Sequence, residues 1–168
     1  MMGAMDIVET LGAKLVVLVP VGARFADVIA PVEICVQEGL ASLSFDLRDL
    51  DLLRQVAPLY STRARLGVHG VVTVDELDAA VGAGARFVLA SVADADLVDA
   101  ASRLGVACLP AALTPTEARL ASRLGSGAVP VSVSPTTAAY ALRQWFTAGA
   151  AAAVVGETLS QAALSETV

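Results

Sequence analysis

The sequence has few of the side chains that most often carry chemistry. Its 168 residues include one lysine (Lys14), one histidine (His69) and two cysteines (Cys35 and Cys108). No C-x-x-C pair or other metal-ligand spacing occurs, so we predict neither a metal site nor a cofactor. Both cysteines lie in apolar patterns typical of buried small residues, which fits a reducing cytoplasm.

Charged and aromatic residues are also scarce, at 17% and 4%, whereas hydrophobic residues make up 56%. The formal net charge is −6 and the arginines form no basic stripe, so nucleic acid is not an expected partner. No uncharged apolar run reaches about 18 residues, so we predict no membrane span. Because so little polar material is available to cover a surface, we expect a homo-oligomer.

The remaining pattern alternates short apolar runs with helical periodicity. Strands and helices are expected to alternate at a spacing of about 20–25 residues, which predicts a parallel sheet with right-handed crossovers. The predicted strands are Lys14–Val21, Ala41–Phe45, Arg65–Val68, Phe87–Ala90, Val106–Leu109, Val129–Val133 and Ala152–Val155. The predicted helices are Asp6–Leu11, Phe25–Leu40, Leu50–Tyr60, 73–81, Asp94–Leu104, 114–124 and 134–146.

Local signals mark several helix starts. Thr73 and Thr114 are each followed by an acidic residue three positions later, the spacing of a capping box, and Asp49 is a plausible cap for the helix at Leu50. With no linker in the chain, we predict a single α/β domain over residues 1–168. A full (β/α)₈ barrel has eight strands. Seven strands predict a shortened TIM-type barrel that is either open or completed by a neighbouring subunit.

Several stretches resemble the 2-keto-3-deoxy-6-phosphogluconate (KDPG) / 4-hydroxy-2-oxoglutarate (KHG) aldolase family. Residues 67–87 are similar to the family's "GAGTVLTPEQLDAAVEAGARF", and residues 109–117 to its "LPGVATPSE". Leu47-Arg48 resembles the end of "LEVTLRT", and residues 134–140 resemble "TPENAADYL". The resemblance implies a TIM barrel, commonly trimeric, that cleaves or forms 2-keto-3-deoxy sugar acids through a lysine Schiff base with pyruvate.

The sequence departs from the family where that chemistry occurs. The family lysine of "LKFFP" corresponds to Ser132, although another alignment of this stretch is possible, and Lys14 stands at the start of the first strand. Ser44 replaces the family glutamate, and Asp46 the threonine that follows it. The "GAGT" turn becomes 67–70, which ends in His69 and Gly70, and Glu157 replaces part of a phosphate-binding "GGS". Arg48, Pro110 and the cap at Thr114 match the family.

Asp46 and His69 are the candidate catalytic pair, because both are expected where neighbouring strands end at the barrel mouth. Arg48 would hold a substrate carboxylate, and Ser44, Gly70, Pro110 and Ser132 complete the predicted binding set. The alternatives are a polar plug in a disused mouth and, for Arg48, a salt bridge to Asp49 or Asp51. Ser44 and Ser132 lack a placed base, so we do not expect them to be nucleophiles.

Two functional hypotheses follow. The first is an aldolase-like protein that has lost Schiff-base activity and serves as a non-catalytic ligand-binding, regulatory or scaffold oligomer, because serine supplies no amine for an iminium. The second is a lyase that acts on small 2-oxo acids with a lysine-independent residue set. Both imply a small 2-oxo acid or sugar acid as ligand.

Overall fold

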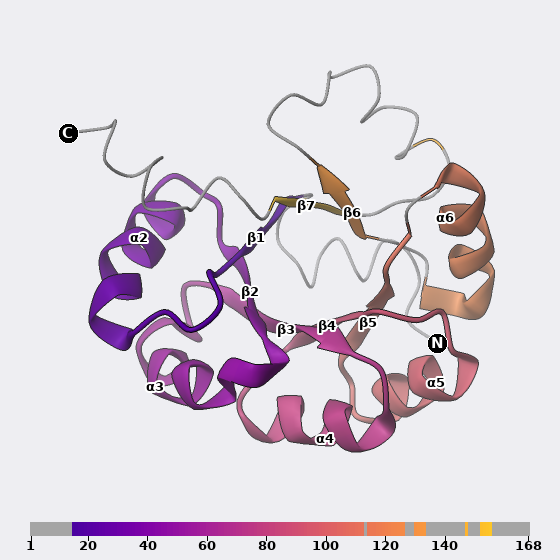
Figure 1. The fold of residues 1–168 in the computed structure, drawn as a ribbon, viewed down its shortest axis with the longest axis horizontal. Helices are drawn as coiled ribbons and strands as arrows, with labels where there is room; N and C mark the ends of the chain where they lie inside the picture. Colours follow the sequence, from indigo (N-terminus) through magenta and orange to yellow (C-terminus); the bar gives the residue numbers. More distant parts are fainter. Residues whose placement is uncertain (1–14, 113, 127–129, 134–146, 148–151, 156–168) are drawn as a thin grey trace.

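The computed structural model describes residues 15–112, 114–126, 130–133, 147 and 152–155 (Figure 1). Within this part of the chain, one parallel sheet contains the strands β1 (Leu15–Leu18), β2 (Ser42–Asp46), β3 (Arg65–Val71), β4 (Phe87–Ala90), β5 (Ala107–Pro110), β6 (Pro130–Val133) and β7 (Ala152–Val155). Each predicted strand is therefore present, with boundaries that differ by a few residues.

The sheet order β5-β4-β3-β2-β1-β7-β6 is that of a barrel whose last strands close onto the first. β7 pairs with β1 through Leu15 and Ala153, and every pairing is parallel. β5 and β6 do not pair with each other among the described residues, so the barrel is open between them. The predicted shortened TIM-type barrel with about seven strands is confirmed.

The helices lie on the outside of the curved sheet (Figure 1). They are α2 (Phe25–Gln37), α3 (Leu50–Tyr60), α4 (Val74–Gly82), α5 (Ala95–Arg103) and α6 (Pro115–Ala121), with a 3₁₀ turn η1 (Leu47–Asp49) and a π turn η2 (Ser122–Ser126). No described helix is long and apolar enough to cross a bilayer. The predicted helices at Asp6–Leu11 and 134–146 lie outside the described residues.

The predicted capping boxes are present at Thr73 and Thr114, where each hydroxyl accepts from the backbone N–H of a glutamate that reaches back to the cap. The prediction that the Asp49 side chain caps the helix at Leu50 was wrong. Its side chain makes no cap bond to α3 and instead accepts a 2.8 Å hydrogen bond from the backbone N–H of Gly22. Asp49 therefore ties the loop after β1 to the end of β2.

Alternation along the strands divides the core into two layers. The outer layer joins the sheet to the helices and includes Leu43, Phe45, Val68 and Leu53, each fully buried. The inner layer contains strand residues alone: Val16, Leu18, Phe87, Leu89, Ala107, Leu109, Ala152 and Val154. Helices are absent from this second set, so it lines the concave face of the sheet.

Phe87 fills the concave face beside Gly67. A methyl group added at Gly67 would overlap the Phe87 ring, and Phe87 is fully buried. Gly67 and Phe87 are paired neighbours on β3 and β4. The ring therefore occupies the space that a side chain at position 67 would take, and the lower barrel interior is packed.

Candidate functional site

Asp46 and His69 meet at the carboxyl end of the sheet. β2 and β3 pair in a register that sets Asp46 directly beside His69. Oδ2 of Asp46 lies 3.5 Å from Nε2 of His69, and the two side chains are 13% and 18% exposed. The structure therefore brings the two predicted residues together in a largely buried contact.

His69 lies within β3, whereas the sequence pattern ended this strand at Val68. β3 continues to Val71, with a register irregularity between His69 and Val71. Gly70 supports that irregularity with a φ of 90°, a conformation that glycine adopts without steric cost. The strand position fixes the His69 backbone by hydrogen bonding, which a loop residue would lack.

Arg48 folds back onto Asp46 rather than onto Asp49 or Asp51, the two partners that the sequence had suggested for a salt bridge. Its Nε and Nη2 donate to Oδ1 and Oδ2 of Asp46 at 2.8 and 2.9 Å, and its backbone N–H donates to Oδ1 at 2.9 Å. Such a two-pronged pair is a strong, oriented ionic hydrogen bond. The arginine that was expected to hold a substrate carboxylate thus already holds one from the protein.

These contacts set the protonation states. The Arg48 guanidinium, which donates to the carboxylate, lowers the pKa of Asp46 to about 2. Burial lowers the pKa of His69 below 6.5, against a raising effect of the Asp46 charge. At neutral pH the site therefore contains an ionised Asp46, an ionised Arg48 and a neutral His69.

Ser44 completes a chain of polar contacts that the sequence did not reveal. Its Oγ lies 3.1 Å from Nδ1 of His69, and Ser44 is fully buried. The Asp46 carboxylate favours a proton on Nε2 of the neutral ring, which leaves Nδ1 to accept from the Ser44 hydroxyl. The expectation that no base lies beside Ser44 was wrong.

The other predicted binding residues lie apart from this cluster or outside the described side chains. Pro110 ends β5, two strands away from β3, and is buried. Ser132 lies in β6 and pairs in register with Val154. Lys14 and Glu157 are outside the described residues, and in the sequence Lys14 directly precedes Leu15, the first residue of β1.

The rim around the cluster is acidic. Every described α-helix carries at least one carboxylate in its first turn, and these turns follow the carboxyl ends of the strands: Asp27, Asp51, Asp75, Glu76, Asp96 and Glu117. The arginines of the described loops on this rim, Arg24 and Arg48, are each paired with an aspartate. The carboxylates stabilise the helix starts, because the amino ends of helices carry partial positive charge.

Chemically, the cluster offers one neutral imidazole between a carboxylate and a hydroxyl. This arrangement can accept or relay a proton. It contains no amine, and no described group of three or more histidine, cysteine or acidic side chains could hold a metal ion. The available sequence signal for Ser44 was the period-two alternation on β2, which places Ser42, Ser44 and Asp46 on one face. In the sheet, Ser44 pairs with Gly67 and Asp46 pairs with His69, so the contact of Ser44 with His69 is diagonal and could be found only once the pairing of β2 and β3 was known.

Comparisons with known proteins identify the fold. No protein-family model matches the sequence, and no curated protein does either. The crystal structure of a KDPG aldolase from Legionella pneumophila, with pyruvate captured as a covalent carbinolamine intermediate, matches 99% of this chain and 92% of its own, with a TM-score of 0.71 and 14% identity. An N-acetylmannosamine-6-phosphate 2-epimerase from Clostridium perfringens matches 96% and 93%, with a TM-score of 0.63 and 14% identity.

A third match is a designed, cube-shaped protein cage made by fusing symmetric oligomeric domains. It has a TM-score of 0.70 and 19% identity over 87% of this chain, which spans 64% of the cage polypeptide. Because identities are this low and the matched proteins include an aldolase and an epimerase, the likeness establishes architecture. This chain therefore has the TIM-type β/α fold found in KDPG aldolases.

Proposed function

We propose that this protein is a KDPG/KHG aldolase-like barrel without class I Schiff-base activity, which serves as a non-catalytic, ligand-binding or scaffolding homo-oligomer. The observation that carries the proposal is the closed set of contacts among Asp46, Arg48, His69 and Ser44. Among the described residues at this end of β2 and β3, these four side chains are paired with one another.

The chemistry of the amine supports the same conclusion. A carbinolamine forms when an amine adds to a carbonyl, as in the Legionella aldolase with captured pyruvate. Lys14 is the only lysine of this chain and precedes the amino end of β1, whereas TIM-barrel active sites lie at the carboxyl ends of the strands. The described carboxyl ends supply no side-chain amine.

Composition and fold support the oligomeric part of the proposal. Charged residues are only 17% of the chain, and several large apolar side chains are exposed, among them Val21, Ile34, Leu59 and Leu120 at 51–54%. The designed cage shows that a protein of this fold has been used as a symmetric oligomeric domain. We propose a trimer by resemblance, located in the cytoplasm, with a small 2-oxo acid or sugar acid as ligand.

A second candidate is a lysine-independent lyase, and the Asp46–His69–Ser44 chain of contacts favours it. In that case Nδ1 of neutral His69 would accept the proton of a substrate hydroxyl that takes the place of the Ser44 hydroxyl, while Asp46 stabilises the resulting imidazolium. Arg48 would have to leave Asp46 in order to bind the substrate carboxylate. The binding roles of Gly70, Pro110 and Ser132 belong to this candidate.

Pyruvate release from KDPG and its unphosphorylated analogue distinguishes the candidates. We expect no release above the buffer rate from the wild-type protein, with a KDPG aldolase as positive control. Release that persists in Lys14→Ala and disappears in His69→Gln would establish the lysine-independent lyase. Release that disappears in Lys14→Ala would overturn both candidate functions.

A further inference from the structure

We propose that a groove at the opposite, amino-terminal end of the barrel binds a small organic carboxylate with a compact apolar body. The groove is a shallow, open depression with a volume of about 420 Å³ between the ends of α3 and α4. Small-molecule sites typically measure about 300–1,000 Å³, so the groove is large enough for such a ligand. It is separate from the mouth cluster and independent of the function proposed for it.

Arg86 gives the groove its charge. Arg54 and Arg86 line it, and no acidic residue does. Arg86 directly precedes β4, is exposed, and its guanidinium makes no hydrogen bond or ion pair with the described part of the chain. The Arg54 guanidinium is instead ion-paired with Asp51 in the first turn of α3, with 2.5 Å between Nη1 and Oδ1, so Arg86 supplies the unpaired charge. A guanidinium with free donors suits a carboxylate.

The nearby backbone does not compete for the Arg86 side chain. Helix ends present carbonyl groups that often attract basic side chains. Here the turns themselves satisfy several of them: Ala57 accepts from Ser61, and Val81 accepts from Gly84. The Arg86 side chain is therefore not needed to end α4, and its charge remains available to a ligand.

The rest of the groove is apolar and shaped by small residues. Ala57, Pro58, Val81 and Ala83 provide the apolar surface, and Ser61 adds one hydroxyl. Gly84 allows the helix ends to approach closely, since a methyl group there would lie 3.2 Å from the Ala57 side chain. Such a surface contacts a branched or aromatic body better than water or inorganic phosphate does.

Calorimetric titration of the full-length protein with benzoate tests the proposal, with benzamide as the uncharged analogue. We expect saturable binding at one site per chain, weakened at least about tenfold for benzamide, and by a similar factor for benzoate in Arg86→Gln, since a charge-assisted hydrogen bond is worth about 1.5–3 kcal/mol. Arg103→Gln is the matched control: Arg103 is an exposed arginine at the end of α5 and does not line the groove.

Two further variants separate binding from folding. A side chain at Gly82, the last residue of α4, enters open space, so both Gly82→Ala and Gly82→Glu should fold. Gly82→Ala should keep benzoate affinity within about twofold, whereas Gly82→Glu adds a carboxylate to the groove that Arg86 lines and should abolish binding. Absence of saturable benzoate binding, equal binding of benzamide or inorganic phosphate, or unchanged affinity in Arg86→Gln would overturn the proposal.

Discussion

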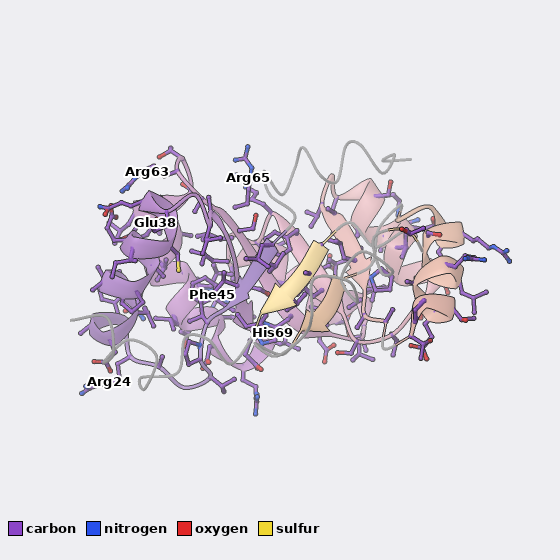
Figure 2. All side chains as sticks on the ribbon, turned by 90° about the horizontal axis from the view of Figure 1, so that it is seen from above. Arg24, Glu38, Phe45, Arg63, Arg65 and His69 are labelled. Carbon is purple, nitrogen blue, oxygen red and sulfur yellow. The ribbon has the colours of Figure 1, made fainter. Side chains whose placement is uncertain are left out.

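Arg48 and Arg86 lie at opposite ends of the barrel and differ in whether a carboxylate holds them. At the carboxyl end, Arg48 is bound through two nitrogens to Asp46 and stands on an acidic rim. At the amino end, Arg86 faces a groove without acidic residues and without a described partner. In Figure 2, Arg65 lies toward the top of the view and His69, which belongs to the same strand, lies toward the bottom. The charge of Arg48 is therefore neutralised within the mouth, whereas the charge of Arg86 at the other end has no described partner.

The packed interior that separates the ends gives the largest expected effect. Gly67→Ala should lower the free energy of unfolding by about 3 kcal/mol, the upper end for overpacking, because the new methyl group overlaps the buried Phe87 ring. Urea denaturation measures the change. Adding Phe87→Leu should restore part of the loss, and strict additivity of the two substitutions would show that the ring does not fill this space.

Ser44→Ala tests whether the mouth contacts are structural. The substitution removes the hydroxyl from Nδ1 of His69 in a fully buried setting, so we expect a loss of about 1–2 kcal/mol in the free energy of unfolding. Ser61→Ala at the exposed amino end is the matched control and should change stability little. If Ser44→Ala and Ser61→Ala lowered the free energy of unfolding equally, the buried contact of Ser44 with His69 would not contribute to stability.

His69 is the only histidine, so a single imidazole signal reports the electrostatics of the mouth by NMR. We expect a pKa below 6.5, because burial disfavours the charged ring. Since the Asp46 charge raises this pKa, Asp46→Asn should lower it further. The unfolded chain then binds the proton more readily, so His69 should reduce stability as the pH falls below 6.5. A pKa above 6.5 in the native protein would contradict a buried neutral ring.

Arg86→Gln should have the smallest effect. Its guanidinium is exposed and has no described partner, so we expect the free energy of unfolding to change by less than about 0.5 kcal/mol in thermal or urea denaturation. Arg48→Gln is the informative contrast, since it leaves the Asp46 carboxylate without its main partner. A larger loss of unfolding free energy in Arg86→Gln than in Arg48→Gln would contradict the assignment of Arg48 as the paired arginine and Arg86 as the unpaired one.

Much of this architecture could be predicted from the sequence. The alternation of apolar runs with capped helices located the seven strands, because βα units repeat a local pattern that each segment carries by itself. The capping boxes at Thr73 and Thr114 depend on residues three positions apart and were predicted for the same reason. Asp49 failed as a cap because its actual partner, Gly22, is distant in sequence.

The site was harder to predict, since it depends on register and side-chain direction. The ends of β2 and β3 indicated that Asp46 and His69 would be neighbours, but the sequence could not show that Arg48 turns back onto Asp46. The contact between Ser44 and His69 spans 25 residues and a diagonal between strands. The amino-end groove depends on how two helix ends approach each other, which no local pattern encodes.

Borohydride trapping with pyruvate tests the central claim most directly. The reagent reduces an imine between pyruvate and an amine to a stable covalent adduct, which intact-mass spectrometry detects. We predict no adduct on this protein under conditions that label a KDPG aldolase completely. An adduct on Lys14 that forms only with both pyruvate and borohydride would contradict the proposal that this barrel has lost Schiff-base chemistry.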